Sequence, residues 1–346
     1  MGDGSLSDID RAALGDAVRQ LLSDSLGYLY PAALRVAVRA GVADHLAEGP
    51  LRVERLAALA GVHADHLKRV LRFLATRDVF REDENGAFHL TTAAGLLRSD
   101  SALPVRTLIL LFTDQLYWLP TGRLEDTVRK GSTVFDEIFG AQFFDYLATG
   151  QERVELFSDA MACLSLTEHS GIVQSYDFPE KGTVVDVGGG LGGLLHAVLT
   201  TNRGLHGILF DREPVLRRHR LDDPAIEGRW ETATGDFYAR LPAGADFYLL
   251  KRILHDKTDA DSVQVLRACR QAMSGQGRVL IIDPLRPRSG DYSVSTKLSD
   301  VLMMAVFEGK ERSEAELATL LAQAGLTLSR VIPTPGALTI VEAIPS

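Results

Sequence analysis

One histidine and several acidic residues stand where the strands of a sheet are expected to end. His255 follows the apolar run at residues 245–250, and Asp186, Asp211 and Asp283 lie at the ends of three other apolar runs. A neutral imidazole, with an ordinary pKa of about 6.5, can accept a proton from a hydroxyl group. We therefore expect a site in which His255 takes a proton from a substrate and nearby carboxylates bind polar or cationic groups.

A glycine-rich turn is the strongest local signal in the chain. The residues Val-Val-Asp-Val-Gly-Gly-Gly-Leu-Gly-Gly at positions 184–193 lead from an apolar strand into a helix. Gly188, Gly190 and Gly193 fit the G-x-G-x-x-G pattern of nucleotide-binding loops. Glycine permits positive φ angles and lets a ligand approach the backbone. The pattern alone is compatible with a nicotinamide dinucleotide or with S-adenosylmethionine.

The acids around this turn favour S-adenosylmethionine. Asp211 lies 23 residues after Gly188 and can accept hydrogen bonds from both hydroxyls of a ribose. In Gly235-Asp236-Phe237, the carboxylate can bind an adenine amino group while the aromatic ring covers the base. Asp186 suits a ligand with a cationic amino group and would repel a pyrophosphate. No diphosphate site is needed to explain this set.

Strands alternate with helices from residue 181 onward. We expect strands at residues 183–187, 207–211, 245–250, 278–283 and 338–343, and helices at 262–273 and 313–324. This alternation predicts an α/β fold with a doubly wound, mostly parallel sheet. Ligands of such sheets bind beyond the carboxyl ends of the strands, where His255 is expected.

The first part of the chain is predicted to be helical. A helix, a turn and a second helix are followed by a hairpin whose turn ends in Asn85-Gly86, which is a winged-helix pattern. Residues 105–180 read as further helices, one of them over 156–173. We expect two domains. The first is a winged-helix-like domain at 1–105. The second, at 106–346, consists of a helical segment that lines the substrate pocket and of a cofactor-binding domain.

Composition limits the classes of function. The 346 residues carry a net charge of −9, which argues against a general nucleic-acid binder. A transcriptional regulator that binds DNA through Lys68, Arg69 and Arg72 of the winged-helix segment is the weaker alternative to an enzyme. The two cysteines cannot form a disulfide framework. The acidic start has no apolar signal segment, and no apolar run reaches membrane-spanning length. We expect a cytoplasmic enzyme without nucleic-acid or membrane partners and without a metal.

Four motifs in order resemble the S-adenosylmethionine-dependent O-methyltransferases of the plant caffeate and bacterial polyketide type. They are Val-Val-Asp-Val-Gly-Gly-Gly at 184–190, Gly-Asp-Phe at 235–237, Leu-Lys-Arg-Ile-Leu-His-Asp at 250–256 and Gly-Lys-Glu-Arg-Ser at 309–313. The resemblance covers nearly the whole chain. It implies a Rossmann-like methyltransferase domain, a winged-helix dimerisation domain and a homodimer.

The resemblance also implies roles for single residues. Gly188 would contact the cofactor backbone, Asp211 its ribose and Lys251 its underside, while Asp236 and Phe237 would hold the adenine. Asp283 and Glu311 would orient His255 as the general base. The chain departs from the family at two positions: Lys257 stands where the family usually has tryptophan, and Asp283 where glutamate is common.

The expected function is methyl transfer to a hydroxyl group of an aromatic small molecule in specialised metabolism. The alternative is a non-methylating reaction, hydroxylation or ring closure, with the same scaffold and cofactor. Candidates for the wall of the substrate pocket are Phe157, Met161, Met303 and Phe307, for which ordinary helical core is an equal alternative. The sequence does not identify the acceptor.

Overall fold

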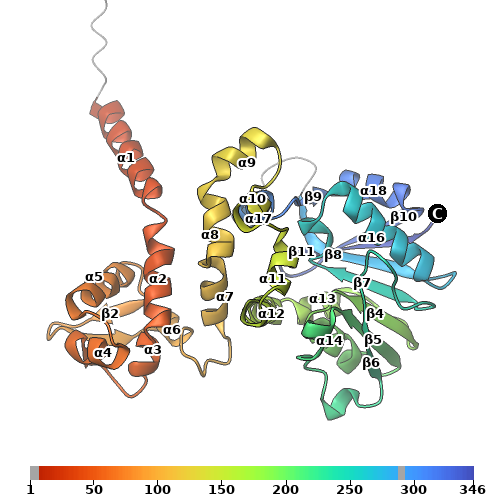
Figure 1. The fold of residues 1–346 in the computed structure, drawn as a ribbon, viewed down its shortest axis with the longest axis horizontal. Coiled ribbons are helices and arrows are strands. Elements are labelled where there is room, and N and C mark those ends of the chain that lie inside the picture. Colours follow the sequence, from red (N-terminus) through yellow and green to blue (C-terminus); the bar gives the residue numbers. More distant parts are fainter. Residues whose placement is uncertain (1–7, 287–292) are drawn as a thin grey trace, which may run out of the picture. The chain divides into compact units, whose positions relative to one another are not determined.

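The chain forms two compact units. The computed structural model describes residues 8–286 and 293–346, and it divides into Met1–Thr113 and Asp114–Ser346 (Figure 1). The expected boundary at residue 105 coincides with the start of helix α7 (Val105–Phe112), which packs against α2 (Leu29–Arg39) and so belongs to the first unit.

The first unit contains small helices and a short sheet. Besides α2 and α7, its elements are α1 (Asp8–Ser25), α3 (Val42–His45), α4 (Val53–Ala60), α5 (Ala64–Ala75), α6 (Thr92–Gly95), β1 (Leu51–Arg52), β2 (Phe80–Glu82) and β3 (Ala87–Leu90). The strands are antiparallel in the order β1-β3-β2. The predicted hairpin is confirmed: Glu82 pairs with Phe88, and Gly86 takes a positive φ of 75° in the turn.

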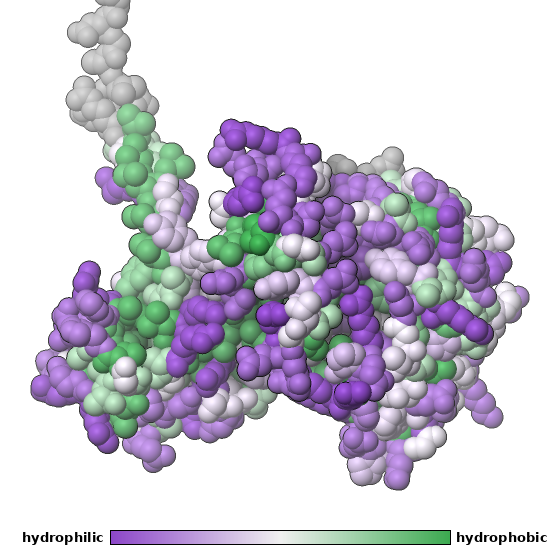
Figure 2. Space-filling model, viewed as in Figure 1, coloured by the Kyte–Doolittle hydropathy of each residue, from purple (hydrophilic) through white to green (hydrophobic). Residues whose placement is uncertain are grey.

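Helix α1 carries an apolar surface that the other described elements of the first unit leave uncovered. Leu14, Val18, Leu21 and Leu22 are all about half exposed or more, and Figure 2 shows hydrophobic residues along this helix. Elsewhere in the unit, leucines of α4 and α5 pack with Phe80 and Phe88 into a buried core. No helix in the described ranges is both long and apolar enough to cross a bilayer.

Six helices open the second unit. They are α8 (Gln115–Gly122), α9 (Leu124–Lys130), α10 (Phe135–Phe139), α11 (Phe143–Ala148), α12 (Gln151–Leu166) and α13 (His169–Ser175). The expected continuous helix over 156–173 is therefore wrong, because it breaks between Leu166 and His169. At the break, the Glu168 carboxylate pairs with Lys251 and Arg252 at the edge of the sheet.

The second unit is built on an eight-stranded sheet. Its strands are β4 (Gly182–Val187), β5 (Leu205–Asp211), β6 (Trp230–Thr234), β7 (Phe247–Lys251), β8 (Arg278–Arg286), β9 (Arg312–Ser313), β10 (Leu326–Pro333) and β11 (Leu338–Pro345). The order is β10-β11-β8-β7-β4-β5-β6, with β9 beside β8. All pairs from β8 to β6 are parallel, and β11 and β10 are antiparallel additions, so the expected mostly parallel sheet is confirmed.

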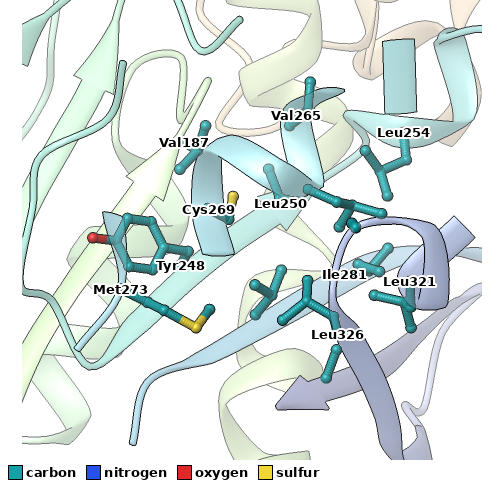
Figure 3. Close-up of a cluster of buried hydrophobic side chains, with 14 of the residues drawn as sticks. Val187, Tyr248, Leu250, Leu254, Val265, Cys269, Met273, Ile281, Leu321 and Leu326 are labelled. Atoms are coloured by element: carbon teal, nitrogen blue, oxygen red, sulfur yellow. The ribbon is translucent and has the colours of Figure 1, made fainter. Parts of the chain in front are cut away.

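Helices cover both faces of this sheet (Figure 1). They include α14 (Gly193–Thr201), α15 (Glu213–Leu216), α16 (Asp259–Ala272) and α18 (Glu314–Gln323). Helix α17 (Val294–Val306) packs against α8, and there are 3-10 turns η1 (Pro224–Ile226) and η2 (Leu254–Asp256). Tyr248 and Leu250 of β7 pack with Val265 and Cys269 of α16 (Figure 3), whereas their neighbour Leu249 faces the opposite core. Because the strands are buried on both faces, their carboxyl ends are held rigidly at one edge.

Candidate active site

The glycine turn connects β4 to α14 with three residues in the left-handed region. Gly188, Gly190 and Gly192 have φ angles of 64°, 59° and 85°, which disfavour any side chain. A Cβ atom on Gly188 would also lie 2.7 Å from the Ile253 side chain. Gly188 therefore lies directly beside the segment that leads from β7 to His255.

Asp211 ends β5 and ties the turn in place. Its Oδ2 accepts a hydrogen bond from the Gly190 N–H at 2.9 Å, and its Oδ1 accepts one from Arg212 N–H at 2.7 Å. Burial raises the pKa of this carboxyl group, and the two backbone donors oppose the shift. The acid expected to bind a ribose thus already orders the glycine turn.

Asp186 is a buried acid with an unused oxygen. The residue is 2% exposed, and its Oδ2 has no hydrogen-bond partner among the described residues. Burial raises the pKa of Asp186 to about 7, while the positive charge of Lys251 and the Leu195 N–H act in the opposite direction. Buried polar groups normally have a partner, so this oxygen points to a ligand with a donor or a positive charge.

The loop after β6 brings an aromatic ring to the glycine turn. A Cβ on Gly188 would lie 3.7 Å from the Phe237 ring, so the two residues are neighbours. Gly235 is required for packing, because a Cβ there would lie 2.6 Å from Phe210. Asp236 Oδ1 accepts a hydrogen bond from the Tyr238 N–H at 2.8 Å. The structure thus brings the predicted Phe237 ring to Gly188.

Lys251 is nearly buried and paired with residues of the preceding helices. Its Nζ lies 2.8 Å from Glu168 Oε2 and 2.5 Å from Ser165 Oγ, and its side chain is 9% exposed. Burial lowers the pKa of Lys251, and Glu168 opposes that shift. Sequence reasoning missed Glu168 and Ser165, which come from the helices before the sheet. Charged or polar residues in a helical stretch gave no signal of this contact.

His255 lies in η2 and is nearly buried. Its neighbour Leu254 anchors the turn in the hydrophobic core (Figure 3). His255 Nδ1 is 3.1 Å from Glu311 Oε1, and the two residues are 7% and 0% exposed. Burial lowers the pKa of His255, but the hydrogen bond that its ring donates to Glu311 and the negative charges of Asp283, Glu311 and Asp256 outweigh this effect, so the pKa is raised.

Asp283 lies near this pair without a hydrogen bond at its Oδ1 to any described residue. Burial raises the pKa of Asp283 to about 6; His255 lowers it, and Glu311 adds a smaller upward contribution. Asp283 therefore acts on His255 through charge, whereas Glu311 holds the ring directly. The shorter side chain at position 283 is consistent with this division.

The Gly-Lys-Glu-Arg-Ser segment is folded tightly onto η2. A Cβ on Gly309 would lie 2.0 Å from the His255 carbonyl oxygen, so only glycine permits this approach. The Arg312 guanidinium donates to the carbonyl oxygens of Leu254 at 2.5 Å and Lys257 at 2.7 Å. The motif therefore holds both ends of the turn that carries His255.

Helix α17 fixes the carboxylate of Glu311. Ser299 Oγ donates to Glu311 Oε1 at 2.5 Å, and Asp300 Oδ1 accepts the Glu311 N–H at 2.9 Å. Glu311 Oε2 is buried and has no hydrogen-bond partner among the described residues. Sequence reasoning missed Ser299 and Asp300, because no motif distinguishes them from other polar residues of a helix.

An aromatic cluster lies in the same unit. The ring of Phe143 is 4.5 Å from that of Phe307 and 5.7 Å from that of Phe157, and Phe144 lies within 6 Å of both. Two of the predicted pocket residues, Phe157 and Phe307, thus meet through rings of α11. Met303 is buried on α17, and Met161 is partly buried on α12. Within the described ranges, no group of three metal-ligating side chains is arranged to hold a metal ion.

Comparisons with known proteins identify the family. Residues 122–327 match the O-methyltransferase domain, and residues 23–100 match the O-methyltransferase dimerisation domain. The chain belongs to the O-methyltransferase family, whose members use S-adenosylmethionine. The resemblance inferred from the four motifs is confirmed, as is the Rossmann-like domain joined to a helical N-terminal domain.

The relatives act in natural-product biosynthesis. The chain is 38% identical to a phenazine O-methyltransferase of Lysobacter antibioticus over 94% of this chain and 95% of the relative. It is also 38% identical to the mitomycin biosynthesis 6-O-methyltransferase of Streptomyces lavendulae, over 96% and 95%. A methyltransferase of calicheamicin biosynthesis, solved with S-adenosylhomocysteine, is 43% identical with a TM-score of 0.81 and covers 99% and 100%.

Relatives differ in the atom that they methylate. The chain is 31% identical to a phenazine-1-carboxylate N-methyltransferase of Pseudomonas aeruginosa, over 92% of this chain and 95% of the relative. Membership of the family therefore establishes the fold of an S-adenosylmethionine-dependent methyltransferase with its dimerisation domain. It does not determine whether oxygen or nitrogen accepts the methyl group, and this choice depends on the residues of the site.

Proposed function

We propose that this enzyme transfers the methyl group of S-adenosylmethionine to a hydroxyl oxygen of an aromatic natural-product precursor, with His255 as the general base. The observation that carries the proposal is the buried hydrogen bond between His255 Nδ1 and Glu311 Oε1 at 3.1 Å. It lies at the carboxyl edge of the sheet, beside the acids around the glycine turn. The relatives of known activity, most of them O-methyltransferases, support the same reaction class.

The residues around the glycine turn fit the cofactor. The unpartnered Oδ2 of Asp186 suits its α-amino group, and Asp211, at the end of β5, suits its ribose hydroxyls. Asp236 and Phe237 suit the adenine, and Gly190, where an added Cβ would have no described atom within 4 Å, leaves room for close approach. Lys251 lies beneath the site, paired with Glu168. When bound, S-adenosylmethionine supplies a methyl group that is activated by the positive charge on sulfur.

His255 then removes the proton from the acceptor hydroxyl. Glu311 takes up Nδ1, which leaves Nε2 to accept the proton. A phenol has an ordinary pKa near 10, so proton removal accompanies the attack of the oxygen rather than preceding it. Glu311 and Asp283 stabilise the imidazolium that forms, because both carboxylates interact favourably with the charged ring.

The aromatic cluster suits a planar acceptor. Phe157 and Phe307, joined through Phe143 and Phe144, offer ring faces and edges on which an aromatic acceptor can pack. Met303 and Met161 can adapt to the outline of a planar ring. Holding the hydroxyl in line with the methyl group supplies part of the rate acceleration by itself.

The N-terminal unit is proposed to form a homodimer. The dimerisation-domain match at residues 23–100 and the apolar surface of α1 support a second copy as the partner. We also propose that the enzyme works in the cytoplasm with small-molecule substrates, without nucleic-acid partners. Light scattering of the intact chain tests the dimer.

Methyl-labelled S-adenosylmethionine tests the reaction. The wild type is expected to move the label onto a naphthol or hydroxyphenazine and to release S-adenosylhomocysteine. His255→Ala should lose turnover while it retains cofactor binding, and exposed His66→Ala should behave as wild type. Full activity of His255→Ala across the pH range would disprove the general-base role.

The same experiment distinguishes the alternative chemistries. Product without label would favour hydroxylation or ring closure on this scaffold, and label on an amine in preference to a hydroxyl would favour N-methylation, as in one relative.

A further inference from the structure

Lys257 places a positive charge inside the aromatic part of the site. This residue stands where the resembled family usually has tryptophan, and it is only 9% exposed. Its Nζ lies 4.3 Å from the ring centroid of Phe144 and 5.6 Å from that of Phe237. The ammonium group therefore occupies space that a large apolar side chain would fill without any charge.

The position of Nζ links the two halves of the site. Phe144 contacts Phe157 and Phe307, which are candidates for the acceptor pocket, and Phe237 lies beside Gly188 at the cofactor turn. Lys257 itself follows His255 by two residues. An acceptor that packs on the aromatic cluster and offers a hydroxyl to His255 thus has Nζ near the edge of its ring.

The backbone and charges around Lys257 favour a ligand contact over a purely structural role. Arg312 holds the Lys257 carbonyl oxygen at 2.7 Å, so the residue starts from a fixed point. Asp256 Oδ1, at 3.0 Å from Nζ, is the carboxylate paired with it among the described residues. An ammonium group has three donors, and burying them is costly unless anions or hydrogen-bond acceptors take them up. The ring faces compensate only part of that cost.

We propose that Lys257 binds a carboxylate that the aromatic acceptor carries next to its methylated hydroxyl, so that the substrate class is aromatic hydroxy acids. This inference rests on the proposed function, because it takes the aromatic cluster as the acceptor pocket. The acceptor carboxylate shares the ammonium group with Asp256 and occupies a donor for which the described residues show no acceptor. Position 257 thereby selects acidic acceptors over neutral ones of the same shape.

Binding of matched compounds to the full-length enzyme, saturated with S-adenosylhomocysteine, tests this proposal. The probes are 1-hydroxy-2-naphthoate and 3-hydroxy-2-naphthoate, each compared by calorimetry with the naphthol that lacks the carboxylate. A charged hydrogen bond in a buried site predicts that at least one acid binds about tenfold more tightly than its naphthol. Lys257→Met should abolish this preference, whereas Lys257→Arg should retain much of it.

Two controls keep the outcomes separate. Lys181→Met removes the same charge from an exposed position before β4 and should keep the preference. If Lys257→Met does not fold, Lys257→Gln takes its place. Equal affinity for the acids and the naphthols in the wild type, or a preference that survives the loss of the Lys257 charge, overturns the proposal. A wild type that fails to bind S-adenosylhomocysteine, or that methylates neither the naphthols nor the hydroxynaphthoates, would instead contradict the proposed function.

Discussion

Replacing Glu311 with glutamine isolates the charge that supports His255. Glutamine keeps the size and the Oε1 acceptor that Ser299 and His255 use, and it removes the negative charge. A hydrogen bond to a charged group contributes about 1.5–3 kcal/mol, which corresponds to about one or two units of histidine pKa. Asp283 and Asp256 remain in place, so we expect a downward shift of about one unit.

The pH profile of Glu311→Gln should therefore change in two ways. The acidic limb of kcat/KM reports the protonation of His255, and it should move to lower pH because the imidazolium has lost its partner. The maximal kcat should fall about 100-fold, since Nδ1 is no longer held by a carboxylate. Release of S-adenosylhomocysteine, measured from pH 5 to pH 10, gives both quantities.

A matched variant separates the charge effect from damage to the fold. Glu308→Gln makes the same change at an exposed position three residues earlier and should leave the profile unaltered. Calorimetric binding of S-adenosylhomocysteine should match the wild type in both variants. An acidic limb that stays in place in Glu311→Gln, with kcat within a few-fold of the wild type, would refute the role assigned to this carboxylate.

Three further predictions concern the parts that position the site. Asp211→Asn should weaken S-adenosylhomocysteine binding about ten- to hundredfold in calorimetry, because the acceptor proposed for two ribose hydroxyls loses its charge. Asp222→Asn, at an exposed position, should have no effect. Ser299→Ala should reduce kcat several-fold, because it releases the Glu311 carboxylate, and it should also move the acidic limb of the kcat/KM pH profile. Ser299→Thr should restore both quantities. An unchanged pH profile together with lowered thermal stability would indicate that Ser299 has a structural role only. Burial raises the pKa of Glu342, but hydrogen bonds from Arg330, Tyr176 and Arg278 hold it at about 2, against an ordinary value of 4.5. The stabilising effect of the charged Glu342 carboxylate is thus complete above pH 4.5 and is lost as the pH falls toward 2. In chemical denaturation, Glu342→Gln should therefore have a lower free energy of unfolding than the wild type at pH 7. This difference in free energy should shrink in acid.

The positions in the fold of the residues proposed to bind the cofactor could be predicted from the sequence. Asp186 and the glycines follow one another along a single strand and turn, and Asp211 ends the next strand, so local patterns place them correctly. Parallel strands align their carboxyl ends, which brings Asp211 to Gly190 at 2.9 Å and Phe237 to Gly188. The same local logic found the Asn85-Gly86 hairpin.

The edge strands and the helix break were harder to predict. Strand β10 alternates apolar and polar residues and pairs only with β11, so it lacks the continuous apolar run of the central strands. The expected helix over 156–173 rested on apolar residues spaced along one helical face, such as Phe157, Met161 and Leu164. The chain nevertheless breaks at Glu168, where the carboxylate pairs with Lys251 and Arg252, more than 80 residues away.

The order of the residues along the chain was sufficient to indicate an α/β methyltransferase with its acids and its histidine at one edge of the sheet, because strand, turn and helix signals act over a few neighbours. Folding in three dimensions settled how His255 is supported. Glu311 bonds to it and Asp283 lies near without a bond at Oδ1, while Lys257 is buried among rings. These contacts join segments tens of residues apart, and their geometry depends on how helices pack on the sheet, which no local pattern encodes.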